Sequence, residues 1–407
     1  MTAQQLEQCR TRLEQYLSDL LTPLGRSERR HWGGVYVRGL LLDGERKSIE
    51  PMAARLGDGN VQAMQQFIGQ SPWAWEPVWE QLSRRMTEEL ESEAVWVIDD
   101  TGFPKQGRHS VGVARQYSGT LGKTANCQVA VTLHHAGEAG SAVLGWRLYL
   151  PESWSEDALR RRAAGVPATV TFQEKWRLAV ELIDRARAWG LADRVVVADG
   201  AYGESTEFRH GLEQRGLSYV VGIPSTVGVW TKPPRVRSRK HRRTGRPTTR
   251  VDYGEQRPRR VKEVALAAHP WKTIRWREGT KGKLHSRFWA TRLHPSHGYE
   301  EGRPPLGERW VLVEWPEGEP EPTRYFVSNL PPGCPLRRLV RLAKSRWKIE
   351  QDYQQFKEEL GLDHYEGRSW RGWHHHVTLV MLAQGFLTLE QLRHKKNFWV
   401  DPPEDPT

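Results

Sequence analysis

One short segment near the end of the chain combines residue types that could act on phosphate groups. Arg346, Glu350 and Lys357 share one stretch, and its apolar spacing predicts a single helix from Pro335 to about Leu360. At about 100° per residue, Arg346 and Glu350 lie roughly 40° apart around the helix axis, and Lys357 lies within roughly 20° of Glu350. A carboxylate flanked by two cations suits a metal ligand beside a phosphate backbone. An ordinary surface ion pair explains the same spacing, because Arg and Glu at i,i+4 are common.

Two predicted strands far upstream end in acidic residues. The apolar run 95–98 is followed by Asp99 and Asp100, and the run 194–198 is followed by Asp199. Sites collect at the carboxyl ends of strands in α/β sheets. Asp99 and Asp100 cannot both face one site, because the side chains of a strand alternate between its two faces. The alternative for each aspartate is a turn or helix cap, a common role of Asp before Gly.

Carboxylates from these two strand ends and from Glu350 could converge on one site. Such oxygen donors hold hard divalent cations. A pair of these cations can activate a water or a 3′-hydroxyl and stabilise the leaving oxygen of an in-line displacement at phosphorus. The residue types therefore predict metal-dependent phosphoryl transfer.

The charge balance favours a polyanionic partner. The 407 residues carry 61 Lys and Arg against 49 Asp and Glu, a formal net charge of +12. The segment 232–262 is a basic arm interrupted by Pro and Gly, and it is best explained by a polyanion, with a solvated linker as the alternative. Its basic residues include Arg239, Lys240, Arg242 and Arg243. Three scattered cysteines give no disulfide framework or metal motif, so we expect a reducing cytoplasm. No apolar run approaches the length of a membrane span.

The periodicity predicts an α/β protein with inserted and appended parts. In chain order we expect an N-terminal helical domain (1–93), the first part of an α/β core with a mixed sheet (94–225), the basic arm with a β-rich insertion (226–323), the end of the core with the Glu350 helix and a final helix (324–395), and a disordered tail (396–407). Within the first part, 48–68 is compatible with a helix-turn-helix, which would bind DNA. Short helix pairs are also common in helical domains without that role.

Two further groups of polar residues are ambiguous. His374, His375 and His376 lack metal-ligand spacing on the final helix, so we interpret them as a polar or DNA-facing patch. Loops after the first acid could contact DNA, although solvated loops are often this polar. The residues concerned are Gln106, Arg108, His109, Arg115 and Lys123.

At the acidic residues the chain resembles the DDE transposases of bacterial insertion sequences, and specifically the group with a Y-x2-R-x3-E-x6-K signature. Arg346, Glu350 and Lys357 fit this spacing, whereas Ala343 stands at the tyrosine position. The likeness covers about 95–387. A β-rich insertion before the last acid is also similar to this group.

The resemblance extends to the other two acids. Asp100, in Ile98-Asp99-Asp100-Thr101, looks like the first acid, with Asp99 as the alternative, and Asp199 looks like the second. The implied fold is a ribonuclease-H-like mixed sheet flanked by helices. The implied catalytic and metal-binding residues are Asp100, Asp199 and Glu350.

The resemblance implies cut-and-paste transposition. The metal site, with Mg²⁺ (or Mn²⁺) and two ions, would cleave DNA at the element ends, and the freed 3′-hydroxyl would attack target DNA. Arg346 and Lys357 would hold phosphates near the cut. The partners would be the terminal inverted repeats and target DNA, bound by a homodimer on paired ends, in the cytoplasm and at the nucleoid.

Three alternatives remain open. A metal nuclease of the same fold would cut DNA without strand transfer. A non-catalytic DNA-binding derivative of a transposase would not be expected to keep three acids. A doubly wound nucleotide-binding enzyme is disfavoured because the chain has no glycine-rich phosphate loop.

Overall fold

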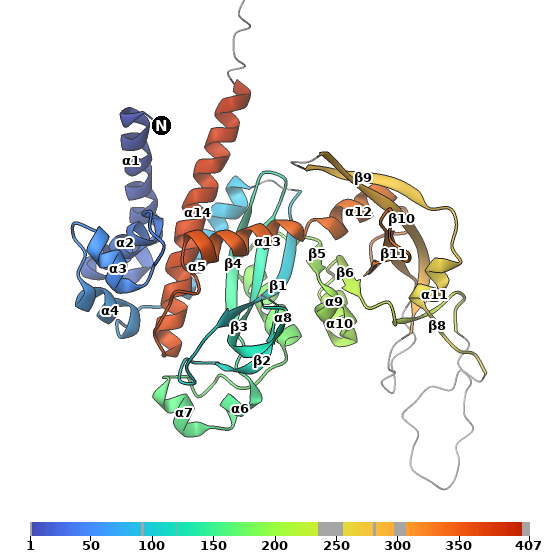
Figure 1. Ribbon diagram of the computed structural model, residues 1–407, viewed down its shortest axis with the longest axis horizontal. Helices are drawn as coiled ribbons and strands as arrows, with labels where there is room; N and C mark the ends of the chain where they lie inside the picture. Colours follow the sequence, from blue (N-terminus) through green and yellow to red (C-terminus); the bar gives the residue numbers. More distant parts are fainter. Residues whose placement is uncertain are drawn as a thin grey trace, which may run out of the picture. The chain divides into compact units, whose positions relative to one another are not determined.

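The computed structural model describes residues 2–90, 93–119, 121–234, 255–279, 282–296 and 307–400, without the side chains of 278–279, 282–283 and 395–400 (Figure 1). The chain forms two compact units. Unit 1 comprises Met1–Ala192 and Trp347–Thr407, and unit 2 comprises Asp193–Arg346. Each unit is described by itself below.

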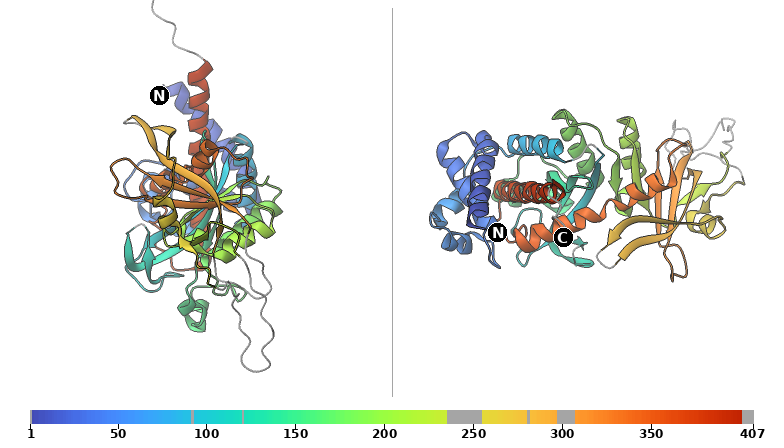
Figure 2. Two further views of the ribbon diagram at one scale, coloured as in Figure 1. Left: turned by 90° about the vertical axis from the view of Figure 1, so that its right-hand side faces the viewer. Right: turned by 90° about the horizontal axis from the view of Figure 1, so that it is seen from above.

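Unit 1 begins with helices that pack against the last helix of the chain. They are α1 (Ala3–Leu20), α2 (Ser27–Leu41), α3 (Ile49–Arg55), α4 (Val61–Gly69) and α5 (Glu76–Glu89). The final helix, α14 (Trp370–Val400), lies between these helices and strand β4 (Figure 2). A capping box of Thr2 and Gln5 starts α1. The two short helices predicted within 48–68 are α3 and α4, and their role in DNA binding stays a prediction.

The sheet of unit 1 is antiparallel and is built around one long strand. The strands are β1 (Val95–Pro104), β2 (Ala114–Ser118), β3 (Lys123–Ala136) and β4 (Ser141–Leu148). Strand β3 pairs with each of the other three. Three helices follow β4 along the chain, namely α6 (Glu152–Ser155), α7 (Ala158–Ala163) and α8 (Lys175–Ala188).

Different helices cover the two faces of this sheet. On one face, a Cβ built on Gly145 would lie 3.1 Å from the side chain of Leu182 in α8. On the other face, the ring of Trp146 lies 5.8 Å from that of Phe356. Phe356 belongs to a π-helical segment, Gln355–Glu359, that directly continues α13 (Trp347–Gln354). Helices α8 and α13 therefore cover opposite faces.

Unit 2 holds a mixed sheet with the strand order β5-β6-β12-β11-β10-β7-β8, and β9 pairs with β10. Its elements are β5 (Val196–Ala198), α9 (Gly200–Glu204), α10 (Thr206–Gln214), β6 (Tyr219–Ile223), β7 (Gly228–Trp230), β8 (Arg259–Arg260), α11 (Val261–Leu266), β9 (Lys272–Gly279), β10 (Gly282–Pro295), β11 (Arg309–Trp315), β12 (Arg324–Ser328) and α12 (Leu336–Lys344). The β5–β6 pair is parallel, and β6 pairs antiparallel with β12. Leu339 and Val340 of α12 pack in one apolar core with Phe288 and Leu312 of the sheet.

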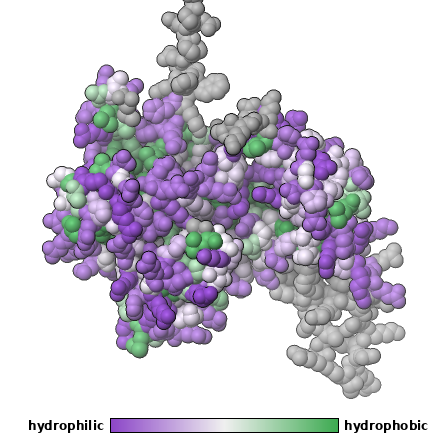
Figure 3. Space-filling view, viewed as in Figure 1, coloured by the Kyte–Doolittle hydropathy of each residue, from purple (hydrophilic) through white to green (hydrophobic). Residues whose placement is uncertain are grey.

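The predicted fold class is confirmed, because mixed α/β structure with helices on the sheet faces is what a ribonuclease-H-like core requires. The division into the five predicted parts stays a prediction. Helix α14 continues to Val400, past position 396 where the sequence predicts the tail to begin. No helix among the described residues is long and apolar enough to cross a membrane. Hydrophilic residues predominate on the face shown in Figure 3.

The single helix predicted from Pro335 to Leu360 is wrong. Helix α12 ends at Lys344, a turn covers Ser345 and Arg346, and α13 starts at Trp347. The hydroxyl and the backbone N–H of Ser345 both bond to the carbonyl of Leu342, at 2.7 and 3.1 Å. Such local side-chain bonds compete with helix continuation. The boundary between the two units falls in this turn, after Arg346.

Candidate active site

Asp99 and Asp100 point to opposite faces of the unit 1 sheet. Asp99 pairs in register with Thr132, which pairs with Trp146, and paired residues of an antiparallel sheet share a face. Asp99 therefore lies on the face that α13 covers. Asp100 lies on the α8 face, where its Oδ2 is 2.7 Å from the ammonium of Lys175. Asp99 is buried and Asp100 is partly exposed.

A buried chain of hydrogen bonds joins α13 to strands β3 and β4. Ser141 donates to Oδ1 of Asp352 at 2.7 Å, and Nδ1 of His134 donates to its Oδ2 at 3.2 Å. On the other side of the imidazole, Nε2 of His134 lies 3.1 Å from the hydroxyl of Thr132, which also meets the hydroxyl of Tyr353. We call Asp352, His134, Ser141, Thr132 and Tyr353 the buried network. It fixes the helix that carries Glu350.

The buried network also reaches the first acidic segment. Burial raises the pKa of Tyr353, and the negative charge of Asp99 raises that pKa further. Thr132 also donates to the backbone carbonyl of Asp99 at 3.3 Å. The sequence analysis missed these residues. A signal was present, because Asp352 falls among Ile349, Tyr353 and Phe356 on the apolar side of α13.

Glu350 is exposed on α13 and lies one turn before Tyr353. The predicted phosphate-binding cation Lys357 lies close to the first acidic segment, because its ammonium donates to the carbonyl of Gly102 at 3.1 Å. The same ammonium lies 5.9 Å from the ring of Phe103. Burial lowers the pKa of Lys357, while the charge of Asp363 acts in the opposite direction.

The predicted angle between Glu350 and Lys357 around the helix axis therefore does not hold. A π-helical turn takes up an extra residue relative to an α-helical turn, and Lys357 lies in such a segment. The roughly 20° separation of Lys357 from Glu350 assumed α-helical geometry throughout. Arg346 lies in the turn before α13 and belongs to unit 2, whereas Glu350 belongs to unit 1.

Asp199 caps the short helix α9 in unit 2. Its Oδ1 accepts from the backbone N–H groups of Ala201 and Tyr202, at 3.0 and 3.3 Å. The cap predicted as the alternative role is therefore present, and the carboxylate keeps its second oxygen. Helix α9 packs directly on β6, where a Cβ on Gly203 would lie 1.8 Å from the carbonyl oxygen of Gly222. The sequence Asp199-Gly200-Ala201-Tyr202-Gly203 thus places the carboxylate at the end of β5.

The chemistry of these donors fits a hard cation, since Asp99, Asp100, Asp199 and Glu350 all offer carboxylate oxygens. Within the described residues, no group of three or more His, Cys, Asp or Glu side chains gathers closely enough to hold a metal ion. Asp199 belongs to unit 2, and the other three belong to unit 1. The basic residues Arg239, Lys240, Arg242 and Arg243 lie outside the described residues.

The prediction of a polar or DNA-facing histidine patch is wrong. His374, His375 and His376 are 2%, 0% and 1% exposed, and each bonds a backbone carbonyl in the interior of unit 1. Burial lowers their pKa values to about 3, 4 and 3, in that order. They are neutral packing residues that join α14 to the segments around it. Consecutive polar residues had suggested exposure, but a backbone carbonyl accepts from one ring N–H of each histidine.

The chain belongs to the DDE superfamily endonucleases, because the model of that family matches residues 19–283. It is therefore an enzyme of the DDE class, as the resemblance implied. It is similar to the probable transposase for insertion sequence element IS701 of Microchaete diplosiphon. The two are 26% identical over 338 residues, which cover 80% of this chain and 75% of the relative. The family match includes Asp99, Asp100 and Asp199, and it ends before Glu350. DDE superfamily nucleases generally use divalent metal ions, and a transposase has DNA as its substrate.

Proposed function

We propose that this chain is an insertion-sequence transposase that cuts DNA at the element ends and joins the freed 3′ ends to target DNA. The family match and the similarity to a probable transposase support this proposal. The main structural support for this chemistry is the hydrogen bond from Lys357 to the carbonyl of Gly102. It joins the segment after Glu350 to β1, the strand of Asp99 and Asp100.

In this proposal Asp99 is the first acid, with Asp199 and Glu350 as the other two. The resemblance alone favoured Asp100. The sheet geometry favours Asp99, because Asp99 shares a face with α13, the helix of Glu350, whereas Asp100 faces α8 and pairs with Lys175. The ammonium of Lys175, 2.7 Å from Oδ2 of Asp100, already offsets part of the charge that this carboxylate would offer a cation.

Asp99, Asp199 and Glu350 would hold divalent ions, Mg²⁺ or Mn²⁺, and two of them by analogy with the superfamily. Ions held there would activate an attacking water or 3′-hydroxyl and would neutralise charge on the leaving oxygen. The ammonium of Lys357 would hold a phosphate beside the scissile bond, and Arg346 would hold another. The buried network limits the motion of Glu350, since Asp352 and Tyr353 anchor the same helix.

The proposed partners are the terminal repeats of the element and target DNA. Two copies would act on paired ends, as expected for a reaction that joins two ends to one target. The proposed alternative is a metal nuclease of the same family without strand transfer. The two differ in one product, since only the transposase joins a 3′ end to a second DNA.

The first test is cleavage of the element's own end DNA with Mg²⁺ or Mn²⁺. The variants are Asp99→Asn, Asp100→Asn, Asp199→Asn and Glu350→Gln, with Glu358→Gln as an exposed control on the helix of Glu350. We expect Asp99→Asn, Asp199→Asn and Glu350→Gln to bind DNA without nicking it. Asp100→Asn and the control should still nick it. A dead Asp100→Asn beside an active Asp99→Asn would reverse the assignment. Nicking that survives Glu350→Gln would contradict the three-acid site. Nicking without joined products would support the nuclease.

A further inference from the structure

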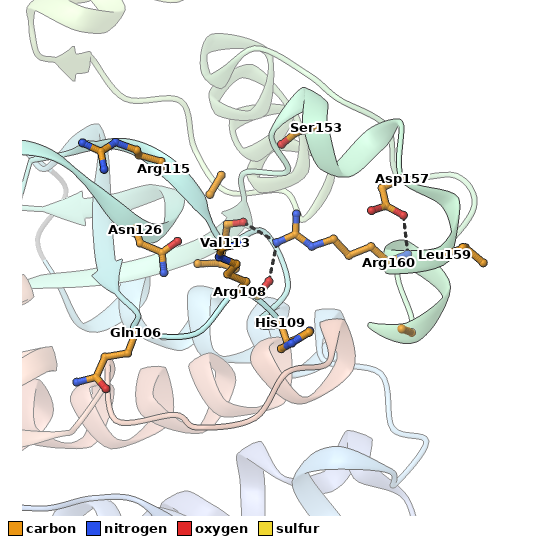
Figure 4. Close-up of a pocket in the computed structure, with 12 residues that line it drawn as sticks. Gln106, Arg108, His109, Val113, Arg115, Asn126, Ser153, Asp157, Leu159 and Arg160 are labelled. Carbon is orange, nitrogen blue, oxygen red and sulfur yellow. Dashed lines mark hydrogen bonds between the residues drawn. The ribbon is translucent and has the colours of Figure 1, made fainter.

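Unit 1 contains a basic groove that the proposed cleavage site does not use. It is a hollow of about 1060 Å³ between the loop after β1, the start of β2 and helices α6 and α7 (Figure 4). Its lining includes Arg108, His109, Arg115 and Arg160, with Asp157 as its acidic residue.

Hydrogen bonds and a stacked ring hold one wall of the basic groove in place. Arg160 donates from Nη2 to the carbonyls of Arg108 and Val113, at 2.6 and 3.1 Å, and its guanidinium stacks 3.9 Å from the ring centroid of Trp154. Trp154 is fully buried and donates to the same Val113 carbonyl at 2.7 Å. These bonds tie α6 and α7 to the loop that follows β1, so the groove keeps its shape without a ligand.

Two arginines and a histidine lie at the mouth of the groove. Arg108, His109 and Arg115 are exposed, and within the described residues their side chains make no hydrogen bond or ion pair. Asp157 already caps α7 by accepting from the backbone N–H of Arg160 at 2.9 Å. Two uncompensated guanidinium groups beside a hollow attract an anionic ligand.

The neighbouring strand adds an exposed aromatic ring. Tyr117 is 63% exposed and lies two residues after Arg115 on β2, so both side chains point to one side of the strand. Across the ribbon they pair in register with Thr124 and Asn126, and Asn126 also lines the groove. Cations that alternate with an exposed aromatic suit a nucleic acid, whose phosphates meet the cations while a base or sugar meets the ring.

We propose that the basic groove and Tyr117 bind the DNA beside the cleaved bond, as a docking site separate from the three acids. This proposal rests on the proposed function for the identity of the DNA. Along β1, Pro104 lies roughly 17 Å beyond Asp99 at about 3.3 Å per residue, and the groove begins after Pro104. At about 3.4 Å per nucleotide, the groove contacts DNA about five or more nucleotides from the cut. Its function is to hold the duplex in register with the acids.

The test compares two matched double variants of the full chain. Arg108→Ala with Arg115→Ala removes the two guanidinium groups at the mouth of the groove. Arg84→Ala with Arg187→Ala removes two exposed arginines of α5 and α8 and serves as the control. The probe is a 40-base-pair duplex, from the element end and of unrelated sequence, and binding is measured by fluorescence anisotropy at several salt concentrations.

We expect the groove variant to bind about tenfold more weakly and its salt slope to fall by about 1.8, since each phosphate that is no longer neutralised lowers the slope by about 0.9. The control should keep the native affinity and slope. Tyr117→Ala should weaken binding without a change of slope, because stacking releases no counterions. Single-turnover nicking at saturating DNA should stay native in the control.

Native affinity and slope in the groove variant would overturn the proposal. An equal loss of DNA affinity in the control would also overturn it, because the effect would then come from the lower net charge alone. Native binding of DNA together with lost binding of a poly-glutamate peptide would assign the groove to an acidic protein instead. If the native chain nicks no DNA but the groove variant loses binding, the docking site stands and the proposed transposition fails.

Discussion

Asp352 is a buried carboxylate whose two oxygens have different partners, Ser141 on one side and His134 on the other. An ionised carboxylate only accepts hydrogen bonds, so His134 carries its proton on Nδ1. Its Nε2 and the backbone carbonyl of Asp99 then share the single hydroxyl proton of Thr132, and the hydroxyl of Tyr353 donates to Thr132. A polar network in the interior specifies its geometry only if every member has a partner.

Removing the carboxylate should therefore be costly. We expect Asp352→Ala to destabilise the protein by about 3 kcal/mol, because two buried donors lose their acceptor. Asp352→Asn should cost less, since the amide keeps one acceptor oxygen. Urea denaturation of the purified variants measures the difference. Glu358→Ala, an exposed change in the segment that continues α13, should stay within about 0.5 kcal/mol of the native protein. A similarly small effect of Asp352→Ala would contradict the structural role of the network.

The sequence was sufficient to place Asp99 and Asp100 on opposite faces, because side-chain alternation is local. It could not tell which face α13 covers. That depends on the pairing of β1 with β3 and on contacts such as Thr132 with Tyr353, which lie more than two hundred positions apart. Spacing singled out Glu350 as a candidate, and its role stays a prediction, whereas Asp352 looked like one more polar residue of a helix.

At the level of elements, the local sequence pattern predicted the strands and most helices. It failed where a side chain ended a helix or where a distant contact buried polar residues. Ser345 ends α12 through its own hydroxyl. The three histidines of α14 are buried because carbonyls from α4, α14 itself and the segment after α13 receive their N–H groups. Sequence periodicity does not report such partners.

Burial of these histidines makes stability depend on pH. His376 donates from Nε2 to the carbonyl of Leu362 and accepts at Nδ1 from the hydroxyl of Tyr36, so it is neutral when folded. Burial lowers its pKa to about 3 from the ordinary 6.5. As the pH falls below 6.5 the unfolded chain binds the proton first, so stability is present above that pH and is lost on the way to pH 3.

We therefore expect the advantage of the native chain over His376→Gln to shrink as the pH falls. Between pH 7.5 and pH 5 the expected loss is about 2 kcal/mol, at about 1.36 kcal/mol per pH unit below 6.5. Thermal unfolding of both proteins at each pH measures it. His374 and His375 remain in both proteins and titrate in the same direction, so their contribution cancels in the comparison. If the difference in stability between the two proteins stays constant with pH, His376 binds its proton equally well in the folded and the unfolded chain.

At the scale of the whole molecule, the sequence predicted the family from an ordered set of acids rather than from any one motif. It did not predict the two compact units. Their boundaries, after Ala192 and after Arg346, cut through the predicted core. Compactness depends on the density of long-range packing, and periodicity describes only local elements. The net charge of +12 is a whole-molecule property that composition gives directly.

That charge leads to a prediction for the basic arm. Replacing Arg239, Lys240, Arg242 and Arg243 by Gln should lower the salt slope of DNA binding by about 3.6, at about 0.9 for each phosphate that the arm no longer neutralises. The weakening should be the same for element-end and unrelated duplexes, because binding to phosphates carries no sequence information. Combining these changes with the groove variant should add the two reductions in slope, since cations at separate places on the DNA release separate counterions. An unchanged slope in the arm variant would mean that the arm is a solvated linker, and the groove would then account for more of the attraction to DNA.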